Sequence, residues 1–201
     1  MPAELNESDL LDDPLAQFAR WYAEARDAGV PQVDAMTLAT ATPEGRPSSR
    51  AVLLKGVDRG FLFFTNYRSR KGRELGDNEH AALSFLWPTL ERQVRVTGPA
   101  ERLSDEESDA YFATRARGSQ LSAWVSEQSR PIADRAELEA RWAALEREYA
   151  GRTIPRPPHW GGFRVVPVEL ELWQARANRL HDRFLYTRMP GDRWSRVRLQ
   201  P

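Results

Sequence analysis

The sequence contains no cysteine. Disulfides, zinc–thiolate sites, iron–sulfur clusters and cysteine nucleophiles are therefore excluded. It also lacks an uncharged run approaching the roughly 20 apolar residues that a membrane-spanning helix needs, and the start of the chain has neither the basic nor the apolar region of a signal peptide. We therefore expect a cytoplasmic protein without membrane contact, in which an organic cofactor carries any redox chemistry.

Several catalytic motifs are absent too. The chain has no GxGxxG motif after a strand, no GxxxxGK[ST] phosphate loop, no HExxH and no GxSxG. It has 3 histidines, too few to favour a multi-histidine site, and we expect no metal.

Length and charge describe one folded domain. The 201 residues, 41% hydrophobic and 29% charged, predict a single domain spanning 1–201. Residues 1–13 hold five acids and no base, and we expect this segment to be flexible. Residues 176–198 hold seven arginines against two aspartates, which indicates a bound anion. The net charge of zero argues against nucleic acid as a partner.

Lysine is rare in this chain. Of the 29 basic residues 27 are arginine, and Lys55 and Lys71 are the only lysines. A bias toward arginine would have replaced a lysine whose compact ammonium is not needed. Both lysines are therefore candidates for function.

Local signals predict the helices. Asp13, followed by proline, begins an amphipathic helix that Gly29 ends. Ser69 caps a short helix, and Ser104 with Glu107 forms the capping box of another. A further turn is expected at 119–124.

A last helix begins at Asp134. Its apolar residues recur at helical spacing, and we expect this stripe to pack in the core. The stripe is Leu138, Trp142, Leu145 and Tyr149.

The rest of the chain reads as short β-rich runs separated by turn signals. The runs cover 35–41, 50–56, 60–66, 81–87, 92–98, 163–174, 183–188 and 194–199. Strands at such short intervals predict an antiparallel meander or barrel. The fold class is therefore mainly β with α-helices outside, an α+β barrel or strongly curved sheet.

The first candidate site is the run Arg179-Leu180-His181-Asp182-Arg183. In an extended segment, residues 179, 181 and 183 project to one side, where three cation-capable groups favour a bound anion. The alternative is a solvated basic edge strand.

Just upstream, strict alternation predicts that Val168, Leu170 and Leu172 point inward. Trp173 then shares the polar face with Glu169 and Glu171. An indole on that face indicates a subunit contact or the wall of a ring-binding site.

A second cationic group comes from the β-rich half. Arg50 and Lys55 lie at the two ends of one strand, and Arg70 and Lys71 lie at a helix start. Simple alternation puts Arg50 and Lys55 on opposite faces, so they share a ligand only through a bulge or a site between subunits. For Arg70 and Lys71 the alternative is a solvated helix face.

Taken together, these segments resemble the pyridoxamine 5′-phosphate oxidase family. The resemblance runs from about residue 13 to 201. The strings that carry it are RAVLLK (50–55), FFTNYRSRKGREL (63–75), LERQVRV (90–96), SDAYFATRARGSQLSAWVSEQS (108–129), PRPPHWGGFRV (155–165), ELWQ (171–174), RLHDR (179–183) and RLQP (198–201).

The resemblance implies a homodimer with an FMN-binding split barrel and FMN at the interface. It also implies oxidation of pyridoxine 5′-phosphate or pyridoxamine 5′-phosphate to pyridoxal 5′-phosphate, with O₂ as acceptor. The implied FMN contacts are Arg50, Ala51, Val52, Leu53, Leu54, Lys55, Phe64, Thr65, Arg70, Lys71, Gln93, Gln128, Ser129, Trp173 and Arg183. The implied substrate contacts are Lys55, Tyr111, Arg115, Ser119, Arg179 and His181, of which Arg179 and His181 would act at the reacting ring.

The chain departs from the family pattern in three places. The segment before the first helix is short and acidic and lacks the Arg and Tyr that many members place over the substrate. Ala116 stands where proline is usual and Ala175 where glycine is usual. We expect modest effects of both on loop rigidity.

Other functions are weighed against this one. A related FMN oxidase of phenazine biosynthesis acts on a substrate without phosphate, and a deazaflavin-dependent reductase shares the fold. A non-catalytic flavin- or pyridoxal phosphate-binding protein is an alternative from a different class. The phosphate contacts Lys55, Arg115 and Ser119 argue against the phenazine enzyme, because without phosphate they would leave unpaired charge.

Overall fold

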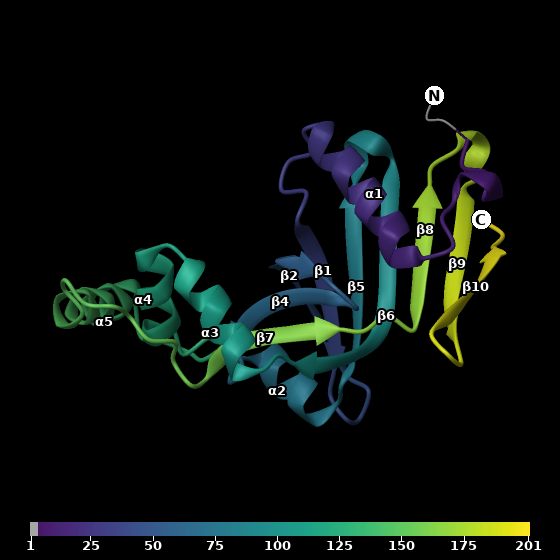
Figure 1. Cartoon of the computed structure of the whole chain (residues 1–201). Helices are drawn as coiled ribbons and strands as arrows, with labels where there is room; N and C mark the ends of the chain where they lie inside the picture. Colours follow the sequence, from purple (N-terminus) through teal and green to yellow (C-terminus); the bar gives the residue numbers. More distant parts are fainter. Residues whose placement is uncertain (1–3) are drawn as a thin grey trace.

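The computed structural model describes residues 4–201. A curved antiparallel sheet fills the body of the molecule, α1 crosses one side of it, and α4 and α5 project as an arm (Figure 1). The strands are β1 (Ala35–Ala41), β2 (Pro47–Leu53), β3 (Gly56–Val57), β4 (Phe61–Asn66), β5 (His80–Trp87), β6 (Arg92–Arg102), β7 (Trp160–Val165), β8 (Glu169–Gln174), β9 (Asp182–Met189) and β10 (Arg193–Arg198). The α-helices are α1 (Pro14–Asp27), α2 (Arg70–Asp77), α3 (Asp105–Thr114), α4 (Arg117–Val125) and α5 (Arg135–Glu148).

The sheet divides at β6. Its main path runs β10-β9-β8-β6-β5-β1-β2, while the last part of β6 leaves this path and pairs with β7, which pairs with β4. Gly98 lies where β6 bends, and a Cβ there would be 1.9 Å from the carbonyl oxygen of Val166. The bend gives the sheet two walls around one core, so the predicted split barrel is confirmed.

Aromatic side chains fill this core. Phe18 and Trp21 of α1 are 1% exposed. The Phe18 ring lies 4.8 Å from Phe61 and 5.0 Å from Phe85, measured between centroids. Helix α1 therefore closes the open side of the barrel, and it begins as predicted at Asp13, whose carboxylate accepts from the amide of Leu15.

The other predicted helix starts are confirmed too. The Ser69 hydroxyl accepts from the amide of Gly72 at 3.2 Å, which begins α2. Ser104 and Glu107 form the capping box of α3. These caps fix where α2 and α3 begin on either side of the site described below.

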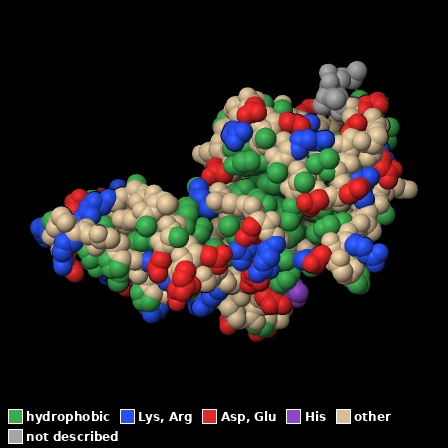
Figure 2. Space-filling model, viewed as in Figure 1, with side chains coloured by type: hydrophobic (Ala, Val, Ile, Leu, Met, Phe, Trp, Pro, Cys, Tyr) green, Lys and Arg blue, Asp and Glu red, His purple; other side chains and the backbone are tan. Residues whose placement is uncertain are grey.

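The prediction of a core stripe on α5 is confirmed only in part, because the stripe packs against a small second cluster and not against the core of the barrel. No residue of α5 is buried, and Leu138 is 39% exposed. Trp142, Leu145 and Tyr149 are partly buried against the second cluster, which contains Phe112. The reason is that α4 and α5 stand away from the barrel, and Figure 2 shows apolar side chains at the surface of this arm.

Two expectations about burial also change. Val168 precedes β8 and is 42% exposed instead of inward, and Glu171 of the supposed polar face is 5% exposed. Glu171 is buried because it forms ion pairs with Arg95 of β6 and Arg183 of β9, the two strands that flank β8.

The acidic start of the chain differs from the expected flexible segment. Leu5 and Leu10 are buried against the barrel, and the Tyr186 hydroxyl donates to the carbonyl of Leu11 at 2.8 Å. Residues 4–13 thus lie along β9 and β10, while residues 1–3 are outside the described part. In residues 4–201 no helix has the length and apolarity to cross a membrane.

Candidate functional site

A cavity of about 600 Å³ opens between β2, β4, α2 and α3, and we call it the cationic cavity. Its size lies within the roughly 300–1,000 Å³ of small-molecule pockets. The residues that line it are Ser48, Ser49, Arg50, Ala51, Val52, Leu53, Lys55, Phe64, Thr65, Arg70, Lys71, Tyr111, Arg115, Gln128, Ser129 and Trp160. Five of these residues are Arg or Lys and none is Asp or Glu.

Arg50 and Lys55 both line this cavity because strand β2 stops between them. β2 ends at Leu53, and the amide of Lys55 donates across to the carbonyl of Leu62 at 2.8 Å. The alternation of side chains is broken there, so both cations face one space within a single chain. The Lys55 ammonium also lies 3.1 Å from Asp34.

Lys71, in the first turn of α2, is a buried cation among neutral oxygens. It is 7% exposed, and its Nζ donates to Thr65 at 3.3 Å, Ser69 at 3.4 Å and Gln128 at 3.1 Å. Burial, together with the charge of Arg50, lowers the pKa of Lys71 to about 8. For Lys71 the alternative of a solvated helix face is therefore wrong.

Stacked aromatic rings form another wall. Phe64 and Tyr111 lie parallel at 3.8 Å, and Trp160 lies 5.6 Å from Phe64. The Arg115 guanidinium lies 4.4 Å from the centre of the Trp160 ring. Burial lowers the pKa of Arg115, and its buried NH1 has no hydrogen-bond partner among residues 4–201.

These features fit a planar group that carries phosphate, such as FMN. A buried donor left without a partner costs about 1–3 kcal/mol, more when it is charged, and an anion in the cavity would satisfy Arg115. The same anion would offset the unfavourable burial of Lys71. The flat aromatic wall suits a ring system.

The other predicted site residues form a second group, which we call the β8–β9 cluster: Gln93, Trp173, Arg179, His181 and Arg183. Gln93, Trp173 and Arg183 lie in register on β6, β8 and β9. The His181 ring lies 4.6 Å from the Trp173 ring. None of the five lines the cationic cavity.

The expectation of an extended segment through residues 179–183 is wrong. Residues Ala177–Arg179 form a short 3₁₀ turn, and Asn178 and Arg179 have positive φ values of 58° and 62°. β9 begins only at Asp182, so Arg179, His181 and Arg183 do not alternate along one strand. The edge-strand alternative is wrong too, because β9 lies between β8 and β10.

Two more predicted contacts lie outside the lining. Leu54 is 6% exposed and belongs to the barrel core, and Ser119 lies in the exposed first turn of α4. The sequence reasoning missed Ser48, Ser49 and Trp160. Ser48 was within reach of that reasoning, because it lies two residues before Arg50 on the same face of β2.

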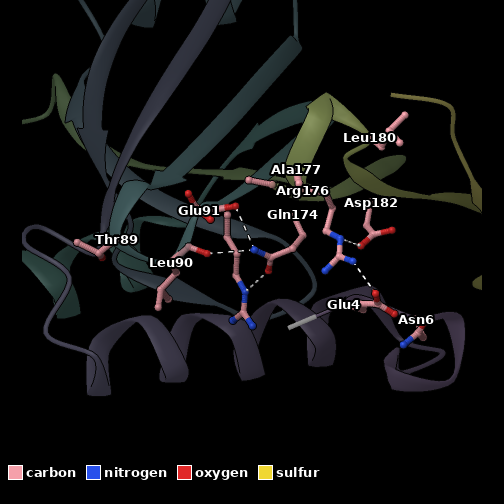
Figure 3. Close-up of a pocket in the computed structure, with 12 residues that line it drawn as sticks. Glu4, Asn6, Thr89, Leu90, Glu91, Gln174, Arg176, Ala177, Leu180 and Asp182 are labelled. Atoms are coloured by element: carbon pink, nitrogen blue, oxygen red, sulfur yellow. Dashed lines mark hydrogen bonds and ion pairs between the residues drawn. The ribbon is translucent and has the colours of Figure 1, made fainter. Parts of the chain in front are cut away.

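A larger cavity, of about 990 Å³, has a different character (Figure 3). It lies between the start of the chain and the turn after β8. Arg176 there is paired with Glu4 at 2.6 Å and with Asp182 at 3.6 Å. Its lining carries both signs of charge, and it holds none of the five cations of the cationic cavity.

Comparisons with known proteins cover the whole chain. A family model described as pyridoxamine 5′-phosphate oxidase matches residues 22–174, and one described as pyridoxine 5′-phosphate oxidase C-terminal dimerisation region matches residues 160–201. The chain is similar to the pyridoxine/pyridoxamine 5′-phosphate oxidases of Rubrobacter xylanophilus, with 61% identity over 99% of this chain and 92% of that one, and of Paraburkholderia phymatum, with 56% identity over 98% and 93%. The crystal structure of PhzG from Burkholderia lata 383 with tetrahydrophenazine-1-carboxylic acid has a TM-score of 0.93 and 36% identity, covering 100% of this chain and 99% of that one.

Proposed function

Because the chain belongs to the pyridoxamine 5′-phosphate oxidase family, we propose that its cationic cavity holds FMN and the phosphate of pyridoxine or pyridoxamine 5′-phosphate. The protein is an FMN-dependent oxidoreductase that converts these substrates to pyridoxal 5′-phosphate with O₂ and releases hydrogen peroxide; with the amine substrate, water is also consumed and ammonia released. The observation that carries the placement is five cations around one cavity without a carboxylate in its lining. We place the enzyme in the cytoplasm, as one domain over 1–201.

Bound FMN would supply the redox chemistry, that is, the acceptor for the hydride of substrate C4′ and the route of the electrons to O₂. The chain's own residues would bind and orient FMN and the substrate. Arg50, Arg70 and Lys71 would hold the FMN phosphate, with charge-assisted bonds from the start of α2. Thr65 and Gln128 already accept bonds from Lys71 and so direct its ammonium.

The substrate phosphate would lie on the other side of the cavity. Lys55, Tyr111 and Arg115 line it there, and Arg115 brings an unsatisfied buried donor. We propose that Ser119, in the next turn of chain, completes this contact on ligand binding. The Trp160 ring under Arg115 holds the guanidinium in place.

We propose that the β8–β9 cluster completes the site from a second copy of the chain. Trp173, Arg179, His181 and Arg183 all fall within the stretch that matches a dimerisation region. Since they do not line the cavity of their own chain, a homodimer with two shared sites would bring them to it. There Gln93, Trp173 and Arg183 would contact FMN, and Arg179 and His181 would orient the substrate ring for hydride transfer.

The similarity to PhzG makes a phenazine precursor the second candidate substrate. A ligand without phosphate would leave the buried NH1 of Arg115 unsatisfied, which favours the phosphorylated substrates.

One experiment separates the candidates. The purified, FMN-loaded protein is assayed under air for peroxide release with pyridoxine 5′-phosphate, pyridoxamine 5′-phosphate and tetrahydrophenazine-1-carboxylic acid. We expect turnover of the two phosphorylated substrates and little of the third. Turnover of the phenazine compound alone would overturn the assignment, and flavin binding without peroxide from any of them would indicate a binding protein.

A further inference from the structure

A buried carboxylate lies next to the cationic cavity and contacts two of the arginines that line it. Glu74, one turn into α2, has a side chain that is 7% exposed and is not among the residues that line the cavity. Its two oxygens serve different partners. Oε1 accepts from Nε of Arg70 at 2.8 Å, and Oε2 accepts from Ser48 at 2.6 Å and from Arg50 at 3.3 Å.

The arrangement joins two elements that are separate in the sequence. Arg50 comes from β2 and Arg70 begins α2, and one carboxylate bridges them. Thr40 of β1 also donates to Glu74, and NH1 of Arg50 donates to Thr40 at 2.6 Å. Arg50 is therefore held by both the carboxylate and the hydroxyl that the carboxylate orients.

The bond to Glu74 leaves the terminal donors of Arg70 for a ligand. Glu74 binds Arg70 through Nε, so this contact does not use the two terminal nitrogens of that guanidinium. Both arginines line the cavity. The terminal nitrogens of Arg50 bond to Leu38, Thr40, Ser48 and Glu74, so these bonds fix the position of its charge at the cavity. A planar guanidinium group that is already held in place loses less conformational freedom when it binds a phosphate.

We propose that Glu74 is a positioning residue for the cofactor phosphate, because it holds Arg50 and Arg70 in the orientation that binds FMN. This inference rests on the proposed function, which supplies the ligand. Glu74 stays ionised at neutral pH. Burial opposes its charge, but hydrogen bonds from Ser48, Thr40 and Arg70 outweigh burial and lower its pKa to about 2.

A positioning role and a purely electrostatic role for Glu74 predict opposite changes in FMN affinity when Glu74 is replaced by alanine. A negative charge close to a phosphate site repels the phosphate, so electrostatics alone predicts that Glu74→Ala tightens FMN binding. Positioning predicts that the same substitution weakens it, since both arginines lose their anchor. We expect the dissociation constant for FMN to rise roughly tenfold or more.

The test measures dissociation constants of FMN and of riboflavin, which lacks the phosphate, by quenching of flavin fluorescence in the apoprotein. Wild type should prefer FMN. In Glu74→Ala the preference should fall by about the same factor as FMN affinity, with riboflavin affinity unchanged. Glu74→Gln, which keeps the shape and one acceptor oxygen, should recover part of the preference. Asp77→Ala, which removes an exposed charge from the same helix, is the matched control and should behave as wild type.

The outcomes are distinct. If Glu74→Ala keeps or strengthens the preference for FMN, Glu74 does not position the arginines. If it weakens both flavins equally, its role is structural and the proposal is overturned. Should the alanine variant not fold, the same two comparisons are made with Glu74→Gln. If wild type itself shows no preference for FMN, the cavity assignment fails and not this inference alone.

Discussion

The cationic cavity and the β8–β9 cluster hold similar side chains in opposite settings. In the cavity Lys71 is buried among neutral oxygens and Arg115 has a donor without a partner in residues 4–201. In the cluster Arg183 donates to the buried Glu171 at 2.8 Å and to the main chain of Gln200 at 2.9 Å.

Each region contains a buried glutamate between two arginines, Glu74 in one and Glu171, which joins Arg95 and Arg183, in the other. Both arginines of the first pair line the cationic cavity, which has no carboxylate in its lining. Of the second pair, Arg95 lines a smaller pocket of about 280 Å³ that also contains Glu169 and Glu171. A cavity lined by several cations without carboxylates, and not the count of arginines, therefore makes an anion site.

The largest effect is expected from removing the unsatisfied donor of the cavity. Arg115→Ala should raise the KM for pyridoxine 5′-phosphate by roughly 10 to 150-fold, because a charge-assisted hydrogen bond contributes about 1.5–3 kcal/mol. FMN affinity should change little. Steady-state peroxide release against substrate concentration measures the effect.

Two comparisons sharpen this prediction. Unphosphorylated pyridoxine should be a poor substrate for wild type and only slightly worse for Arg115→Ala, because it has no phosphate for Arg115 to bind. Arg117→Ala is the matched control, since Arg117 is exposed and donates to the carbonyls of Tyr149 and Arg152. An equal loss with both substrates, or loss of the flavin, would show that Arg115 is structural.

The next prediction tests whether the two regions meet across a subunit boundary. Arg115→Ala and His181→Ala should each have little activity at low substrate concentration, and the two variants are co-expressed and assayed together. With random pairing, half of the dimers are mixed and each has one intact site, so about one quarter of wild-type activity should return. Activity that stays at the mean of the two parents would mean that one chain supplies both halves.

A third prediction concerns pH and the burial of Lys71. The pKa of Lys71 is about 8, so above pH 8 the free protein loses the ammonium, and FMN affinity should fall toward tenfold per pH unit. The stability of the apoprotein should instead increase as the pH rises. The unfolded chain binds this proton more tightly than the folded one, so the unfavourable contribution of Lys71 disappears as pH rises from about 8 toward the ordinary lysine value.

The measurements are flavin titrations and chemical denaturation of the apoprotein at pH 7 to 9. Lys71→Met should bind FMN more weakly at every pH and remove both trends. A wild-type affinity that does not vary between pH 7 and 9 would mean that Lys71 does not touch the phosphate.

The smallest effect is expected at Ala116, between the cavity wall and α4. Its φ of −55° is open to proline, and Arg115 before it has a ψ of 145°, which a following proline tolerates. Ala116→Pro should raise the free energy of unfolding by about 0.4–1 kcal/mol by restricting the unfolded chain. For this length the shift in Tm is at most about 2–4 °C. Ala113→Pro, inside α3, is the control and should destabilise the protein. A lower Tm in both variants would contradict the inference that the backbone at Ala116 accepts proline.

Much of the fold could be predicted from the sequence. The caps at Asp13, Ser69, Ser104 and Asp134 each begin a helix in the structure, because a cap depends on residues at most three positions away. Most residues implied by the resemblance also line one cavity. Glu74 was missed because, in a short run of charged residues, nothing marks which one faces inward.

The amino-acid sequence alone specifies the set of elements and the chemistry of the side chains they carry, since caps, turns and alternation act between near neighbours. Which cations share a space depends on tertiary contacts. The end of β2 puts Arg50 and Lys55 into one cavity, α2 packed on β1 buries Glu74 behind Arg50, and the positive φ of Arg179 breaks an alternation that the sequence favoured. The first two depend on contacts between segments far apart in the chain, and local spacing carries no information about such contacts.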